Sequence, residues 1–449
     1  MTLQQVKQVF RKLKIQKVKL GVFDIDGILR GKYVSLEKFF SAAESGLGFC
    51  DVIFGWDSSD ALYDSVTFTG WHSGYPDALA KIDLASFRVL PWENGTAFFL
   101  LDLFKPDGAP LAISPRQVLR NVAARADELG YAARVAVEFE YFFFRESPQS
   151  ARDKHYRDMI PLSPGMFGYS ILRTSVHSDL AHDILDMTRK MEIELEGFHT
   201  ETGPGVYETA IKYDDALRAA DKAALFKTVV KILAQRHGLL ATFMAKWNAN
   251  LPGCSGHIHQ SLYSKDGRRN LFYSSGNQGG MSQLMRAYMA GQCELMRDFA
   301  VMFCPTVNSY KRLVPGTWAP TNVTWGNDNR TTALRAIVAS SRSTRVEHRL
   351  PGADANPYLS VAASLASGLH GINHEAKLSA PEQNAYKADA PTLPRHLEEA
   401  VAIFRSSAAA REFFGEEFVD HYAATRDWEA RQYRKAVTDW ELERYFEII

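Results

Sequence analysis

The alternation of apolar and polar residues predicts short strands near the N-terminus and a longer strand further along. Residues 18–23 form an apolar run, Asp26 and Gly27 supply turn chemistry, and residues 31–34 return as a second strand. Residues 135–144 are mostly β-branched and aromatic, which is typical of a buried strand. The first half of the chain is therefore expected to contain sheet structure.

A three-to-four-residue spacing of apolar positions predicts helices as well. Residues 115–129 are expected to form one helix and residues 214–237 another, which ends at Gly238. The second places three apolar residues on one face: Leu225, Val229 and Leu233. The chain from Leu393 onward is charged and predicted to be helical.

Changes in composition along the chain indicate how it is divided. Residues 49–87 are rich in Gly, Ser, Asp and aromatic residues with weak periodicity, so they are expected to form long loops. The Lys-Pro-Asp-Gly stretch at residues 105–108 is a boundary signal. We therefore expect an α+β protein with a small domain over residues 1–105 and a large mixed domain over residues 106–449.

Overall composition excludes several classes of function. The 449 residues contain 52 Lys plus Arg and 52 Asp plus Glu, so no overall basic charge favours a nucleic-acid or membrane partner. The cysteines are too sparse for a disulfide framework, and the charged N-terminus lacks the apolar core of a signal peptide. No apolar run reaches the roughly 20 residues of a membrane helix. These features predict a reduced, cytoplasmic protein.

Paired carboxylates carry the first chemical signal. In a strand over residues 135–144, Glu138 and Glu140 share a face and lie about 6.6 Å apart. Neighbouring carboxylates on a buried strand repel each other unless cations neutralise them, and this spacing suits two metal ions. A strand with one wet face, its glutamates paired to Lys or Arg, is the alternative.

Further acidic and imidazole pairs follow in the sequence. Glu201 and Glu208 flank a Gly-Pro-Gly turn that can bring them together, although acidic residues also flank many surface turns. His257 and His259 follow a glycine loop at positions i and i+2, so they would share a strand face and serve one site. A histidine in such a strand is otherwise a hydrogen-bonded core residue.

Arginines concentrate in residues 308–349. They are Arg312, Arg330, Arg335, Arg342, Arg345 and Arg349. Guanidinium groups bind carboxylate and phosphate in bidentate fashion, so this segment is predicted to handle anions. The alternative is a solvated basic face. The surrounding Pro and Trp residues disfavour it, because they interrupt any periodic polar stripe.

Taken in order, the motifs resemble the glutamine synthetase superfamily from about residue 15 to the C-terminus. They are E-F-E, E-T-G-P-G-V-Y-E, G-H-I-H-Q-S, N-S-Y-K-R-L-V-P-G, N-R-T-T-A-L-R and R-V-E-H-R-L-P-G-A-D-A-N-P-Y. The resemblance implies an N-terminal β-grasp domain followed by a large catalytic domain. It also implies a ring-shaped homo-oligomer, a dodecamer in many members, whose active sites are completed by a neighbouring subunit.

The resemblance also implies roles for individual residues. One metal ion, Mg²⁺ or Mn²⁺, would be held by Glu140, Glu201 and Glu208, and a second by Glu138, His257 and Glu347. Glutamate would be bound by Arg312, Arg349 and Gly253. The phosphate and transition-state site would contain Arg330 and Arg335. ATP, a substrate, would contact Glu196, His259, Ser261 and Arg345. The γ-carboxylate of glutamate would be phosphorylated, and a nitrogen nucleophile would then displace phosphate.

Departures from the family pattern lie on the side of the nitrogen nucleophile. Trp318 stands where ammonia-using members have a glutamate that binds ammonium and removes its proton. Asp51 and Asp57 compete for the role of the ammonia-binding aspartate. The residue before Gly253 is Pro252, and the one after it is Cys254, in place of the usual Asn-Gly-Ser.

These departures imply a γ-glutamylamide synthetase that joins glutamate to a small organic amine, with Trp318 offering an apolar surface. Trp318 packing the flap without a role in specificity is the alternative for that residue. For the whole protein, the alternatives are a glutamine synthetase that uses ammonia and a non-catalytic structural relative. Six intact metal-binding positions disfavour the last, because burying carboxylates without a ligand is costly.

Overall fold

The structure, a computed structural model, describes residues 1–276 and 280–449. An N-terminal sheet has the strand order β2-β1-β6-β4-β3, with β5 also paired to β6. Its strands are β1 (Lys17–Phe23), β2 (Leu29–Val34), β3 (Leu47–Cys50), β4 (Asp77–Ile82), β5 (Arg88–Val89) and β6 (Thr96–Phe104). β1 and β6 run parallel in its middle. This mixed sheet, with helix α2 (Leu36–Ser45) beside it, agrees with the expected β-grasp arrangement.

A larger sheet forms the centre of the rest of the chain, with the order β13-β14-β15-β12-β7-β9-β8. Its strands are β7 (Tyr131–Phe144), β8 (Leu195–Thr200), β9 (Val206–Ile211), β12 (Gly256–Ser264), β13 (Trp325–Asn327), β14 (Leu334–Ile337) and β15 (Arg345–His348). The short strands β10 (Asp214–Asp215) and β11 (Leu240–Thr242) pair with β7.

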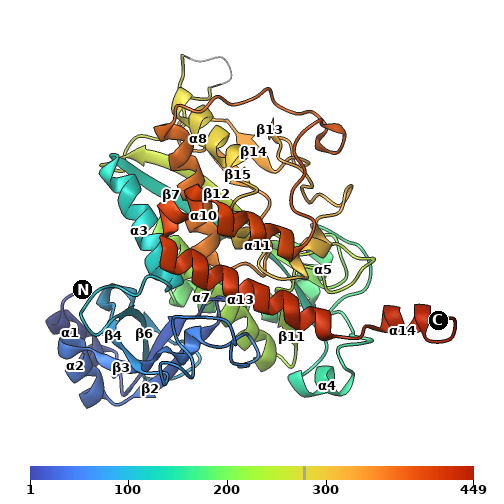
Figure 1. Cartoon of the computed structure of the whole chain (residues 1–449). Coiled ribbons are helices and arrows are strands. Elements are labelled where there is room, and N and C mark those ends of the chain that lie inside the picture. Colours follow the sequence, from blue (N-terminus) through green and yellow to red (C-terminus); the bar gives the residue numbers. More distant parts are fainter. Residues whose placement is uncertain (277–279) are drawn as a thin grey trace.

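Helices cover the sheets and form most of the C-terminal third. Besides α2 they are α1 (Leu3–Lys12), α3 (Pro115–Glu128), α4 (Pro148–Asp153), α5 (Ile171–Val176), α6 (Ser178–Lys190), α7 (Ala216–Arg236), α8 (Gln283–Glu294), α9 (Ala300–Phe303), α10 (Pro357–Asn373), α11 (Leu397–Ser406), α12 (Ala408–Phe414), α13 (Glu416–Lys435) and α14 (Asp439–Tyr445). In Figure 1 the N-terminal sheet lies at the lower left, α13 crosses the front, and α14 extends away from the body.

Most of the predicted elements are present. The strand over residues 135–144 lies within β7, the helices over 115–129 and 214–237 correspond to α3 and α7, and the tail is helical. Residues 49–87 are largely loop, but they also contain β4, which the sequence reading did not identify. The α+β fold is confirmed. The expected domain boundary near residue 105 stays a prediction, although β6 ends at Phe104 and the larger sheet begins at Tyr131.

Helix α7 covers one face of β7, and the glutamates of β7 point to the opposite face. Val135, Val137 and Phe139 are buried on the face that α7 covers. The Phe139 ring stacks on Phe226 of α7 with centroids 6.2 Å apart. Glu138 therefore points to the other face of the sheet, as the period-two pattern predicts.

Within the described residues, no helix is long and apolar enough to cross a membrane.

Candidate active site

Glu208 is the centre of an acidic group on the open face of the large sheet. Strand register places Glu208 of β9 opposite Glu140 of β7 on one side and opposite His199 of β8 on the other. His199 Nε2 lies 3.2 Å from a Glu208 oxygen, and its Nδ1 lies 4.0 Å from a Glu201 oxygen. The Gly-Pro-Gly turn thus brings Glu201 and Glu208 together. His199, Glu201 and Glu208 each offer a ligand atom within 4.8 Å of the others.

A neighbouring group on the same face combines glutamates with histidines. His257 Nδ1 lies 3.4 Å from Glu138 and 3.3 Å from Glu347, and it is buried between them. His259 Nε2 lies 3.7 Å from the other Glu138 oxygen. Glu138, His259 and Glu347 likewise offer ligand atoms within 4.8 Å of one another. Both histidines therefore reach the predicted metal group, and their division between metal and ATP contact stays a prediction.

The pKa values of these carboxyl groups show how strongly their environment acts on them. Burial raises the pKa of Glu208 to about 8, and the charges of Glu138 and Glu140 add to the effect, while the hydrogen bond from His199 opposes it. Burial also disfavours the charged form of Glu347, but the positive charges of His257, His259 and Arg349 outweigh it and lower its pKa to about 2.

This donor set fits divalent cations. Carboxylate oxygens and imidazole nitrogens are ligands that Mg²⁺ and Mn²⁺ accept. Burial and the neighbouring charges of Glu138 and Glu140 disfavour the ionised form of Glu208, and bound cations would favour it. Glu140 adds a further oxygen to this set. Its Oε2 accepts a hydrogen bond from the backbone N–H of Ser255 at 2.6 Å, and its Oε1 is the oxygen that a cation would use.

Buried arginines border the acidic face. Arg349 donates to Glu347 at 2.5 Å, and Arg335 donates to the other Glu347 oxygen at 2.9 Å. Arg312 packs over Gly253, where a Cβ would lie 2.6 Å from the Arg312 side chain. The Nε atoms of Arg312 and Arg349 are buried without a hydrogen-bond partner among the described residues. Such unsatisfied donors fit the carboxylate groups of glutamate.

The remaining predicted contacts are spread around this face. Arg345 donates to His259 Nδ1 at 3.2 Å, and Ser261 lies two residues further along β12. Glu196 is exposed near the start of β8, and Arg330 is exposed between β13 and β14. Their roles towards ATP and phosphate stay predictions.

Trp318 lies close to the arginine side of the site. The residue is 65% exposed, and its backbone adopts a positive φ of 61°, which is uncommon outside glycine. Its carbonyl accepts a hydrogen bond from Arg349 Nη2 at 3.4 Å. The same arginine contacts Glu347, so the Trp318 backbone is one residue away from the predicted metal group.

The candidate aspartates are held by their own chain. Asp51, in the short helix η1 (Asp51–Phe54), accepts a hydrogen bond from Thr69 at 2.6 Å and is buried. Asp57 accepts a hydrogen bond from the indole of Trp428 in α13 at 2.9 Å. These contacts give both aspartates structural partners away from the acidic face.

Sequence reasoning missed His199, which reaches both Glu201 and Glu208. The aromatic ring of Tyr169 stacks on His199 with centroids 4.3 Å apart. A signal for His199 was present, since it stands two residues before Glu201 and so shares its face of an extended strand. No comparable signal was available for Tyr169, which comes from an irregular segment.

An acidic sheet face bordered by buried arginines is a site suited to metal-assisted chemistry on carboxylate and phosphate groups. Comparison with known proteins agrees. The family described as glutamine synthetase, catalytic domain, matches residues 112–445. The chain belongs to the glutamine synthetase family.

Individual relatives cover nearly the whole chain. The Type-1 glutamine synthetase 2 of Dictyostelium discoideum is 47% identical over 98% of this chain and 86% of its own length. A glutamate–isopropylamine ligase of a Pseudomonas species is 43% identical over 99% of this chain and 98% of its own. A solved GmaS/ADP complex superposes with a TM-score of 0.85 at 29% identity, covering 98% of this chain and 99% of that one.

Proposed function

We propose that this protein is an ATP-dependent ligase that joins the γ-carboxylate of glutamate to a small organic amine through γ-glutamyl phosphate. The family membership supports carbon–nitrogen ligation. The solved relative that contains ADP supports ATP as the phosphoryl donor. The observation that carries the choice of an organic amine is Trp318, which offers an indole where ammonia-using members of the family have a glutamate.

The chain's own residues account for the binding of glutamate and phosphate. Arg312 and Arg349 would hold the carboxylate groups of glutamate, using their unsatisfied Nε donors. Arg330 and Arg335 would neutralise charge that develops on the transferred phosphoryl group. Phosphorylation is needed because a carboxylate is a poor electrophile, whereas an acyl phosphate has a good leaving group.

We also propose that two divalent cations act in each site. Glu140, Glu201 and Glu208 would hold one and Glu138, His257 and Glu347 the other. His199 lies close to the first group and His259 to the second. Bound cations would supply charge neutralisation for the phosphate groups of ATP. Burial, together with the charges of Glu138 and Glu140, raises the pKa of Glu208, and this supports the assignment.

Trp318 favours an organic amine over ammonia for two reasons. An alkyl or aryl group can bury apolar surface against the indole, and at about 25 cal/mol per Å² a small group gains ~1–3 kcal/mol. Ammonia, mostly protonated at neutral pH, would lack the carboxylate that binds ammonium and removes its proton. The isopropylamine ligase among the relatives supports an organic amine, and the glutamine synthetase among them is the basis of the alternative.

The test is an amine panel with glutamate, ATP and Mg²⁺, in which product mass and phosphate release are measured. We expect kcat/KM for at least one alkyl or aryl amine to exceed that for ammonia ten- to hundredfold. Trp318→Glu should shift the ratio towards ammonia, and Trp318→Phe should keep the preference for amines. A wild type that makes glutamine faster than any other amide would instead be a glutamine synthetase. Absence of phosphate release with glutamate and every amine would favour a structural relative.

We further propose a ring-shaped homo-oligomer in the cytoplasm. Exposed apolar side chains gather before and within α5, and they are Met166, Phe167, Tyr169, Ile171, Leu172 and Val176. Apolar clusters of this kind support burial against another copy. The cysteines are free thiols, which suits a reducing compartment. Light scattering of the purified protein measures the oligomer size, which we expect to be a dodecamer.

A further inference from the structure

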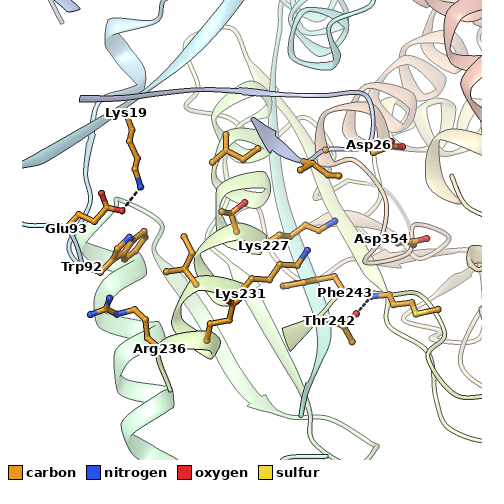
Figure 2. Close-up of a pocket in the computed structure, with 17 residues that line it drawn as sticks. Lys19, Asp26, Trp92, Glu93, Lys227, Lys231, Arg236, Thr242, Phe243 and Asp354 are labelled. Carbon is orange, nitrogen blue, oxygen red and sulfur yellow. Dashed lines mark hydrogen bonds and ion pairs between the residues drawn. The ribbon is translucent and has the colours of Figure 1, made fainter. Parts of the chain in front are cut away.

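A cavity of about 810 Å³ lies between the N-terminal sheet and α7. One wall is formed by β1, the turn that follows it and the segment around Trp92; another is formed by α7 and the residues after β11. Its volume is in the range of small-molecule sites. Figure 2 shows Lys227 and Lys231 extending from α7 into this space, with Phe243 beside them.

This cavity is separate from the acidic face. The Nζ atom of Lys227 lies 5.7 Å from the ring centroids of both Phe139 and Phe243. Phe139 stands between Glu138 and Glu140 on β7, so its ring points to the opposite side of the sheet from their carboxylates. The cavity therefore lies behind the sheet, on the side that α7 covers.

The charges lining the cavity are incompletely balanced. Lys19 pairs with Glu93 at 2.5 Å, and Asp26 pairs with Arg426 at 2.6 Å. In contrast, neither Lys227 nor Lys231 forms an ion pair within residues 1–276 and 280–449. These two lysines are one helical turn apart, where like charges repel.

Lys231 is exposed to solvent, so the cost of burial falls on Lys227. It is 91% buried, and its Nζ donates to the carbonyl of Ala355 at 3.2 Å. That leaves ammonium donors without a charged acceptor in a buried place, and burial with the charge of Lys231 lowers the pKa of Lys227 to about 7. Asp354 opposes this shift; its Oδ2 accepts from Thr306 and Ser309, and its buried Oδ1 has no hydrogen-bond partner among the described residues.

We propose that this cavity is a second ligand site, which binds a small organic carboxylate through Lys227 and Lys231. The carboxylate would supply the missing counter-charge. The apolar walls, which include Ile28, Leu29, Trp92, Ile232 and Phe243, would cover the body of the ligand. The site lies behind the catalytic face, so this inference does not depend on the proposed ligase activity.

Binding should be coupled to protonation of Lys227. The groups that face it are Lys231 on α7, Asp354 after β15, Asp26 in the turn after β1, and the uncharged rings of Phe139 and Phe243. Above pH 7 a substantial fraction of Lys227 is neutral, and a bound carboxylate favours the ammonium form. The complex should therefore take up close to one proton at pH 8 and almost none at pH 6.

The test is calorimetry on the full chain with succinate and benzoate as probes, inorganic phosphate as a comparison, and buffers of different ionisation enthalpy. We expect succinate or benzoate to bind once per chain with the stated proton uptake at pH 8. Lys231→Met should weaken this binding at least tenfold, whereas Lys231→Arg should restore most of it. Lys190→Met, at an exposed lysine of α6, removes the same charge elsewhere and should leave binding unchanged.

Lys227→Met should not lower the thermal stability of the chain, because the buried amine costs stability there, and it should lose the proton uptake. Binding of phosphate alone would overturn the assignment to a carboxylate. Failure of both carboxylates to bind, or binding that Lys231→Met leaves intact, would show that Lys227 serves only the backbone contact at Ala355.

Discussion

At the scale of single residues, the period-two placement of Glu138 and Glu140 was sufficient to predict an acidic sheet face. Only some of the residues that surround these glutamates could be predicted from the sequence. His199 could have been paired with Glu201 by the same rule, whereas the contact between Arg349 and the Trp318 carbonyl depends on a loop conformation that no local pattern encodes. The burial of Lys227 was equally hidden, because its cavity is built by segments far apart in the chain.

Glu208→Gln should remove catalysis while preserving the fold. The amide keeps the size of the side chain but loses the charge that a metal ion needs, so we expect phosphate release to fall at least about a hundredfold. In the presence of a chelator at pH 8.5 the variant should be as stable as the wild type or more so, because the buried carboxylate costs free energy there. Glu443→Gln, in α14, is the matched control. Normal activity in the variant would exclude Glu208 from the metal site.

Lys227→Met should change how stability depends on pH. The folded-state pKa of Lys227, about 7, lies below its unfolded value, so the unfolded chain binds more protons between these values and wild-type stability rises with pH. The slope contributed is about 1.4 kcal/mol per pH unit between pH 7.5 and 9.5. Urea unfolding of both proteins across this range measures it. Equal slopes in the two proteins would show that Lys227 keeps an ordinary pKa.

At the scale of elements, long periodic segments were predictable and short irregular ones were not. α7 and β7 carry clear apolar periodicities over 21 and 14 residues. β4 was missed because its six residues alternate only weakly, with buried Ala78 and Ala80 as the inward positions. Pairing with β3 and β6 makes it a strand, and this is tertiary information.

Arg330, in the β13–β14 connection, and Arg335, in β14, should respond differently to substitution. Arg330 is exposed, so Arg330→Ala should lower kcat about a hundredfold, the effect of ~3 kcal/mol of lost transition-state stabilisation, with little change in Tm. Arg335 bridges Asp328 and Glu347, so Arg335→Ala should lower both kcat and Tm. Kinetics and thermal unfolding of the two variants test this contrast. A large fall in Tm for Arg330→Ala with normal activity would assign that residue to structure.

At the scale of the whole molecule, Arg116 connects the N-terminal sheet to the helices of the larger part. It lies in α3 and contacts Asp83 at 2.7 Å, Asp102 of β6 at 2.7 Å and Asp221 of α7 at 2.8 Å. Tyr358 of α10 donates to Asp221 at 2.7 Å, so a further helix joins the network. Sequence alone gave no indication of this network, because Asp221 is 105 residues from Arg116 and 137 residues from Tyr358.

Arg116→Met should destabilise the protein by ~3–5 kcal/mol, because it leaves three carboxylates in a largely buried place without their shared cation. The matched control is Arg120→Met: Arg120 pairs only with Asp102 among the described residues, is 39% exposed, and should cost less than about 1 kcal/mol. Urea unfolding followed by tryptophan fluorescence and by circular dichroism measures both variants. Because Arg116 connects the N-terminal sheet to α7, Arg116→Met should also separate the two signals, with the N-terminal part unfolding first. A variant that unfolds at the wild-type urea concentration in one transition would show that packing alone holds the two parts together.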